Sequence, residues 1–206
     1  MLDILYRYLL RFVDLTPKEF TRIEELIEIR QFARKTRLVA IGEKENYLDF
    51  IITGLTRKFF YRHKEEVVIQ IAKENEMIYS SVSFFSSTPS DFVVEAIENT
   101  TLASISRSNI EKMYDISPKM DRLGRLVIID WLLQKETMEC SRLKQGPKER
   151  FLDFIGDNPD LLLRVPQKFL ASYLSIKPET FSRYKHLLVK QPVNGLFKSL
   201  DTVNHQ

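Results

Sequence analysis

The sequence predicts an α+β protein made of a compact β unit, one long helix and a terminal group of short helices. Three observations support this prediction: β-rich runs between polar turns from residue 38 to residue 106, a sustained helical pattern after Pro118, and two amphipathic helices joined by a short turn near residue 176. The chain has 206 residues, which fits one large domain or two small ones. Its hydrophobic content of 44% and charged content of 29% are typical of a globular protein.

The first helix is predicted to begin after Thr16. Thr16 suits the N-cap, Pro17 suits the first helical position, and Glu19 completes the spacing of a capping box. The apolar residues that follow share one helical face, and they are Phe20, Ile23, Leu26 and Ile27. The helix is therefore expected to continue through Ile27.

An all-β unit is predicted after this helix. Its short β-rich runs are Leu38–Ile41, Leu48–Thr53, Leu55–Tyr61, Val67–Ala72, Phe92–Ile97 and Leu102–Ile105. Gly42 and Gly54 stand at breaks between runs, where a positive φ angle is expected.

The helical pattern from Pro118 to about Lys144 carries apolar residues on more than one face. A helix of this kind must bury both faces, typically one on its own domain and one on a partner chain. We therefore predict a dimer formed through this helix, with Leu123, Val127 and Trp131 as dimer-helix residues. The alternative is a helix buried wholly within its own chain.

The terminal helices are expected at Lys148–Ile155, Pro166–Leu174 and Pro178–Leu188. The last two are joined by a turn around Ser175–Lys177, which is the pattern of a helix-turn-helix. Ala171 is small where the helices cross, and the apolar seam between them consists of Leu170, Leu174, Ile176, Phe181 and Leu187.

Packing does not explain the polar residues that gather at the start of the last helix. Arg183 can give two hydrogen bonds to guanine, Glu179 can accept one from cytosine, and Thr180 can touch a phosphate or a thymine methyl group. Phosphate contacts are assigned to lysines, and the whole predicted DNA-binding set is Gln167, Lys168, Lys177, Glu179, Thr180, Ser182, Arg183 and Lys185. The alternative is a solvent-exposed helix in which Glu179 and Arg183 form an ion pair of roughly 0.3–0.5 kcal/mol.

The charge distribution is consistent with a polyanionic partner for the terminal helices. Residues 1–140 contain 20 Lys+Arg and 22 Asp+Glu, a net charge of −2, whereas residues 141–206 contain 11 and 6, a net charge of +5. A basic segment of this size fits nucleic acid or a membrane surface equally well.

The order of β unit, long helix and helix-turn-helix, together with the segment Leu174-Ser-Ile-Lys-Pro-Glu-Thr-Phe-Ser-Arg183, resembles the Crp/Fnr transcription regulators. Glu179 and Arg183 match that family's base-reading residues, whereas Lys177-Pro178 replaces its common Ser-Arg pair. The resemblance implies a cyclic-nucleotide-binding-like, jelly-roll-like β-roll over 1–117, a dimerisation helix over 118–145, and a winged-helix-like DNA-binding domain over 146–206. It also implies a homodimer on a pseudo-palindromic operator, with RNA polymerase as a partner. Val189–Lys198 is a poor match to the family's wing.

The same resemblance predicts that cyclic AMP does not bind. The family holds the ribose with a Gly-Glu pair and the cyclic phosphate with an Arg-Ser or Arg-Thr pair, but this chain has Tyr79-Ser80 and Ser90-Asp91 at those places. Asp91 would repel a phosphate. Hydroxyl and carboxylate groups remain for another polar effector, and the candidate pocket residues are Ser80, Ser81, Ser90 and Asp91.

Several other classes are excluded or disfavoured by composition. The single cysteine, Cys140, and the three scattered histidines do not provide a disulfide framework, a zinc site, an iron–sulfur cluster or a haem ligand set. No apolar stretch of about 20 residues and no signal-peptide pattern is present, so a cytoplasmic protein without a membrane partner is expected. No catalytic motif stands out, and the chain is not expected to be an enzyme. The alternative to a DNA-binding regulator is a small-ligand sensor that acts through a protein partner.

Overall fold

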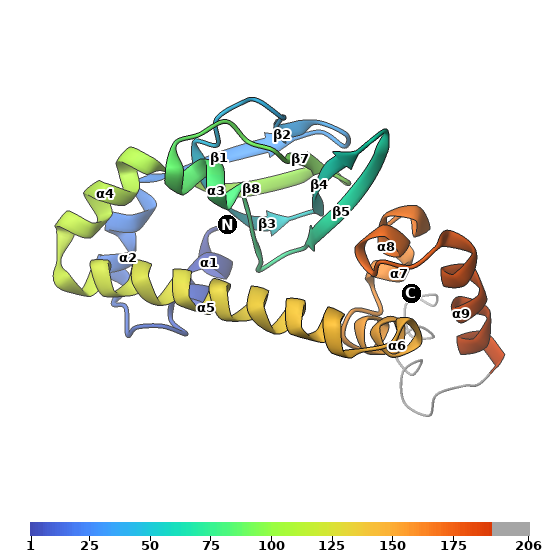
Figure 1. Ribbon diagram of the computed structural model, residues 1–206. Helices are drawn as coiled ribbons and strands as arrows, with labels where there is room; N and C mark the ends of the chain where they lie inside the picture. Colours follow the sequence, from blue (N-terminus) through green and yellow to red (C-terminus); the bar gives the residue numbers. More distant parts are fainter. Residues whose placement is uncertain (191–206) are drawn as a thin grey trace. The chain divides into compact units, whose positions relative to one another are not determined.

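The α+β class is confirmed by the computed structural model (Figure 1), which describes residues 1–190 and the side chains of residues 1–186. The chain divides into a unit of Met1–Lys135 and a second unit that begins at Glu136. The division falls inside one continuous helix, α5 (Pro118–Lys144). The start and end predicted for this helix are confirmed.

Two antiparallel sheets form the centre of the first unit. One has the strand order β1-β8-β3-β6 and the other β2-β7-β4-β5. The strand bounds are β1 (Ile27–Phe32), β2 (Arg37–Val39), β3 (Tyr47–Thr53), β4 (Thr56–Arg62), β5 (Glu65–Ala72), β6 (Met77–Ile78), β7 (Val93–Ala96) and β8 (Thr100–Ser106). Between the sheets lies an apolar cluster of Val39, Ile51, Ala72, Ile78, Val94 and Leu102. Because this cluster draws on both sheets, they enclose a common interior, which is the roll expected from the sequence.

Helices cover the opposite face of the β1-β8-β3-β6 sheet. They are α1 (Asp3–Leu9), α2 (Pro17–Glu24), α4 (Arg107–Ile116) and the first half of α5, which gather on one side of the roll (Figure 1). Phe50 and Ala103 project from the sheet into a cluster with the helical residues Leu5, Phe20 and Leu123. Successive strand residues point to opposite faces, so Phe50 belongs to this second core while its neighbour Ile51 belongs to the roll interior.

The capping box predicted at Thr16 is present. The backbone N–H of Glu19 donates to Thr16 Oγ1 at 3.3 Å, and the backbone N–H of Thr16 donates to Glu19 Oε2 at 2.8 Å. The side chain of Glu19 also pairs with Lys119 at the start of α5, at 2.8 Å. Hydrogen bonds from Lys119 and Thr16 lower the pKa of Glu19 to about 2.

The predicted extension of this helix through Ile27 is wrong. Helix α2 ends at Glu24, and Ile27 begins β1, where it pairs with Ile105 of β8. A ladder of backbone hydrogen bonds to β8 replaces the helical bonds that local spacing alone would favour. The sequence analysis also missed β6, α1 and the short helix α3 (Ser81–Ser86). The positive φ angles expected at Gly42 and Gly54 are confirmed, at 85° and 100°.

The face predicted for dimerisation on α5 needs correction. Leu123 is 1% exposed and Val127 is 8% exposed, because both pack into the helical core of their own unit. Trp131 is half-buried and stacks on Tyr79, with ring centroids 5.1 Å apart. Periodicity identifies the apolar faces of a helix but not which face meets its own domain. The exposed apolar residues of α5 are instead Ile129, Leu132, Leu133, Met138 and Leu143.

The second unit contains the short helices that the sequence predicts. They are α6 (Pro147–Asp157), α7 (Leu161–Arg164), α8 (Gln167–Tyr173) and α9 (Pro178–Lys190), of which α7 was not predicted. The expected wing lies mostly beyond residue 190, outside the described part of the chain, and the Leu187 side chain is also outside it. Within the described residues no helix is long and apolar enough to cross a membrane.

Candidate functional site

Helices α8 and α9 form the predicted helix-turn-helix. The turn between them is closed by backbone hydrogen bonds from Leu174 to Leu170 at 2.9 Å and from Ile176 to Ala171 at 3.0 Å. Ser175 adopts a left-handed conformation with φ 55°, which ends α8 and redirects the chain. The turn is therefore fixed by its own backbone.

Close packing holds the two helices together. Leu170 and Phe181 are fully buried and Ala171 is 1% exposed, so a small side chain lies at the place predicted for the helix crossing. The Phe181 ring meets Phe151 of α6 edge to face, with centroids 5.1 Å apart and an interplanar angle of 85°. This core presents the first turns of α9 outward on a rigid base.

Arg150 of α6 is a positioning residue that the sequence analysis missed. Its Nη1 donates to the carbonyls of Gln145 at 2.6 Å and Arg142 at 3.2 Å, and its Nε donates to the Leu174 carbonyl at 3.1 Å. One guanidinium thus joins the end of α5 to the turn of the helix-turn-helix. No local signal distinguishes Arg150 from a solvated surface arginine.

The structure exposes most of the residues predicted to meet DNA. Glu179 and Arg183 lie one helical turn apart on α9, and both are exposed, as are Gln167, Lys168 and Lys177. The remaining members of the set are half-buried, and they are Thr180, Ser182 and Lys185.

The intrahelical ion pair that was the alternative reading does not form in the described structure. Arg183 lies over the ring of Tyr184, 5.6 Å from its centroid, and no salt bridge joins it to Glu179 among the described residues. Both charged side chains therefore remain available to an outside partner.

Two of the predicted pocket residues come together inside the roll. Ser80 is fully buried and Ser90 is 2% exposed, and their hydroxyl oxygens are 2.8 Å apart, with Ser90 also 2.8 Å from the Phe92 carbonyl. Ser81 is half-buried on α3, and Asp91 is exposed. Asp91 therefore does not join the buried Ser80–Ser90 pair, although it directly follows Ser90 in the chain.

Lys58 was missed, although it is the principal charge in this part of the roll. It is 1% exposed, and its Nζ donates to the Tyr79 carbonyl at 3.0 Å. Its cross-strand partner is Val94, a member of the interior cluster. Burial, and then the charge of Lys135, lower the pKa of Lys58 to about 7. A lysine within the β-rich run Leu55–Tyr61 was the available signal, but alternation suggests an exposed position for such a residue.

Other side chains of the protein fill the space around Lys58. Trp131 stacks on Tyr79, and Lys135 Nζ lies 4.8 Å from the Trp131 ring centroid. Glu45, which is 6% exposed, accepts hydrogen bonds from the backbone of Ser80 at 3.1 Å and Tyr47 at 3.3 Å. Burial raises the pKa of Glu45. The hydroxyls of the predicted Ser80 and Ser90 thus bond to each other, beside the buried Lys58 and Glu45 that the sequence analysis did not predict.

Among the described residues no group of three His, Cys, Asp or Glu side chains could hold a metal ion, and Cys140 is exposed.

The lowered pKa of Lys58 predicts a rise in stability with pH. Below pH 7 both the folded and unfolded chains hold this proton, whereas between about pH 7 and pH 10.5 the unfolded chain binds more. The free energy of unfolding should rise through this window, by at most about 1.4 kcal/mol per pH unit from this group. Urea denaturation at pH 7 and pH 9 measures the rise, which Lys58→Met should remove.

Lys64→Met makes the same substitution at an exposed position of the β4–β5 turn and is the matched control. It should keep the wild-type dependence on pH. If the free energy of unfolding depends on pH equally in wild type and Lys58→Met, the pKa of Lys58 is not lowered in the folded chain.

Neither a protein-family model nor a curated protein sequence matches the chain. Solved structures do match it. FixK2 from Bradyrhizobium japonicum is 18% identical, with a TM-score of 0.68 over 81% of this chain and 86% of that one. CLP from Xanthomonas campestris, a c-di-GMP-responsive global regulator that links cell–cell signalling to virulence gene expression, is 16% identical, with a TM-score of 0.65 over 85% and 93%.

The catabolite activator protein of Thermus thermophilus is also similar, with 18% identity and a TM-score of 0.54 over 90% of this chain and 88% of that one. These likenesses extend over the roll, the long helix and the terminal helices, since each covers more than four fifths of the chain. The chain therefore has the Crp/Fnr-type fold, a cyclic-nucleotide-binding-like roll followed by a helix-turn-helix.

Proposed function

We propose that the chain is a homodimeric, sequence-specific DNA-binding regulator of transcription. The observation that carries this proposal is the face of α9, where exposed Glu179 and Arg183 are held by a buried core and are not paired with each other. A helix-turn-helix places such a second helix in the major groove, where Arg and Glu distinguish base pairs. The net charge of +5 over residues 141–206 suits a polyanion.

The proposed contacts divide into two classes. Arg183 reads guanine, Glu179 reads cytosine, and Thr180 and Ser182 provide hydroxyls beside them. The exposed amines of Lys168 and Lys177, together with Lys185, meet phosphates, and Gln167 stands at the start of α8 for a further backbone contact. RNA polymerase is the protein partner that transcription control implies. The cytoplasm, where such a regulator meets DNA, is the proposed location.

Base reading by Arg183 can be tested with a randomised DNA library. Arg183→Ala should relax the base preference at one symmetric position of a pseudo-palindrome and cost roughly 1–3 kcal/mol of binding free energy, because a bidentate contact is lost. Lys185→Ala should weaken binding to all sequences alike and lower the salt slope by about one. Sequencing of the bound DNA at two salt concentrations separates these effects. Half-sites should lie about 34 Å apart.

Two outcomes of this assay count against the proposal. If Arg183→Ala loses overall affinity but selects the wild-type motif, Arg183 does not read bases. If wild type selects no motif and shows no salt-dependent affinity, the chain is better explained as a ligand sensor that acts through a protein partner.

The dimer is proposed to form through the exposed stripe of α5. Ile129, Leu132 and Leu133 are 43%, 56% and 56% exposed, and their spacing places them on one helical face. This face is distinct from the one that carries Leu123 and Val127, so a symmetric partner can bury it without disturbing the first unit.

Leu133→Glu should weaken the dimer at least about tenfold, because the substitution places two charges near a symmetric apolar contact. Sedimentation velocity at micromolar concentration measures this change. Leu163→Glu, at a residue of α7 that is 76% exposed, makes the same substitution elsewhere and should leave the mass unchanged. A wild-type chain that sediments as a monomer would rule the dimer out.

We further propose that cyclic AMP does not bind in the roll. The Ser80 and Ser90 hydroxyls face each other, Lys58 holds the Tyr79 carbonyl, and Trp131 covers Tyr79. A nucleotide would have to displace these side chains. Calorimetry with cyclic AMP should therefore give no saturable heat at micromolar protein. Micromolar or tighter affinity would contradict this proposal, and would mean that the phosphate-binding pair lies elsewhere in the sequence or that another cation, such as Lys58, replaces the missing arginine.

A further inference from the structure

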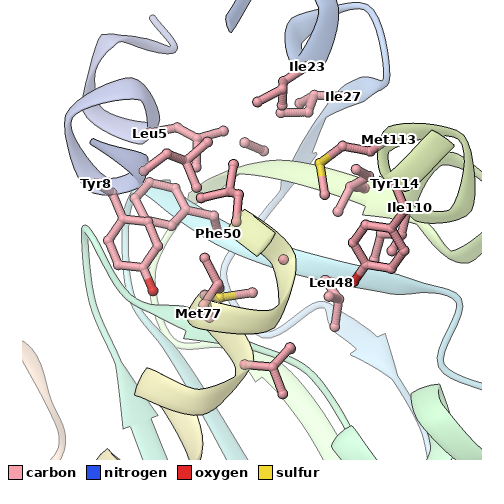
Figure 2. A pocket seen from close by; sticks show the side chains of 17 residues that line it. Leu5, Tyr8, Ile23, Ile27, Leu48, Phe50, Met77, Ile110, Met113 and Tyr114 are labelled. Carbon is pink, nitrogen blue, oxygen red and sulfur yellow. The ribbon is translucent and has the colours of Figure 1, made fainter. Parts of the chain in front are cut away.

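A cavity of about 90 Å³ lies against the helical face of the β1-β8-β3-β6 sheet. Phe50 and Ala103 form its floor, and Leu123 and Val127 of α5 form part of its wall. Figure 2 shows the lining side chains converging on this space from α1, α2, α4 and the strands. The Ser80–Ser90 pair lies elsewhere and does not line it.

The lining of this cavity is almost entirely carbon and sulfur. Met77 and Met113 contribute thioethers, and the phenols of Tyr8 and Tyr114 stand on opposite sides of the space (Figure 2). No charged side chain lines it. Burial raises the pKa of Tyr8 to about 12 and also raises that of Tyr114, so both phenols stay neutral and able to donate a hydrogen bond. A charged molecule would lose its hydration here without gaining a counter-ion.

Gly124 helps to form the wall between α4 and α5. A Cβ atom at this position would overlap the ring of Tyr114, so the missing side chain allows the ring to lie directly against α5. Glycine lowers the stability of a helix interior, but at this position it leaves room for the Tyr114 ring that lines the cavity. This part of the wall therefore depends on Gly124 and Tyr114 together.

We propose that this cavity is a binding site for a small, uncharged, predominantly apolar molecule on the scale of one aromatic ring. Dry apolar cavities of roughly 150 Å³ bind benzene or xenon. Xenon is the smaller of these probes, and the flexible side chains of Met77 and Met113 can shift to admit a ring. The proposal goes beyond DNA binding and does not depend on it. An occupant would touch α5, the helix that continues into the second unit.

The test is nuclear magnetic resonance of the full-length protein labelled with ¹³C at the methionine methyl groups. Xenon and benzene should each give saturable shifts of the Met77 and Met113 signals, because both line the cavity. Met120, which is buried but outside the lining, and Met138 in the second unit should move much less. Benzoate, the charged analogue of benzene, should give no saturable shift.

Two substitutions reduce the cavity. Ala103→Ile should lower the affinity for benzene at least tenfold. Val127→Ile adds only one methylene group and perturbs the fold less, and it should lower the affinity severalfold. Val82→Ile adds the same methylene group as Val127→Ile at a residue of α3 that is 60% exposed, and it should bind as wild type does.

Three results would overturn the proposal: no saturable shift with either probe, equal shifts of all methionines, or unchanged benzene affinity in both cavity variants. Because no DNA is present, such a failure would leave the proposed regulator untouched. Conversely, if wild type selects no DNA motif, the proposed binding site in the cavity is unaffected.

Discussion

The rest of the structure depends on one constraint, which is that helix α5 is held at both ends, by buried apolar side chains at its start and by hydrogen bonds at its end. At its start, Met120, Leu123 and Val127 are buried in the first unit, and each apolar side chain of this kind contributes roughly 1.5–3 kcal/mol when fully buried. At its end, the last carbonyls of the helix have no intrahelical partner. Arg150 donates to one of them, that of Arg142, and to the carbonyl of Gln145 directly after the helix, and its positive charge also suits the negative end of the helix dipole. Since the same guanidinium holds the Leu174 carbonyl, the end of α5 and the turn before α9 are fixed together.

The two faces of the β1-β8-β3-β6 sheet offer opposite environments, and α5 contributes to both. On the inner side, Lys58 and Glu45 are buried charges whose desolvation costs stability, and hydrogen bonds to Tyr79 and Ser80 only partly offset it. On the outer side the cavity is apolar and unfilled, so its lining forgoes dispersion contacts that close packing would supply. Selection for stability alone would place well-packed apolar side chains in both spaces. The first departure includes Lys58 of β4 in the facing sheet, and the second lies where the β1-β8-β3-β6 sheet packs against α5.

Short-range sequence patterns predicted the structure correctly where capping and backbone conformation alone determine it. The capping box at Thr16, the bounds of α5 and the turn around Ser175 follow from short-range patterns, and the structure has all three. Non-local contacts account for the failures. Ile27 continues a helical spacing but pairs with a strand almost eighty residues away, and Leu123 lies on an apolar face whose partner is its own unit. Arg150 and Lys58 look like surface cations until tertiary packing surrounds them.

The face of α9 is the part of the site that the sequence predicted best, and the reason is physical. Its side chains project from a module whose core, around Phe151 and Phe181, is built within a few dozen residues. Helix spacing alone then places Glu179 and Arg183 on the surface. The roll interior, by contrast, is assembled from residues between Val39 and Lys135, so one replaced side chain changes its chemistry without changing the fold. Structures 16–18% identical to this chain share its architecture, yet that likeness does not specify what the roll holds. A fold of this kind can therefore keep the exposed face of α9 while the side chains inside the roll change, because the two regions have no side chains in common.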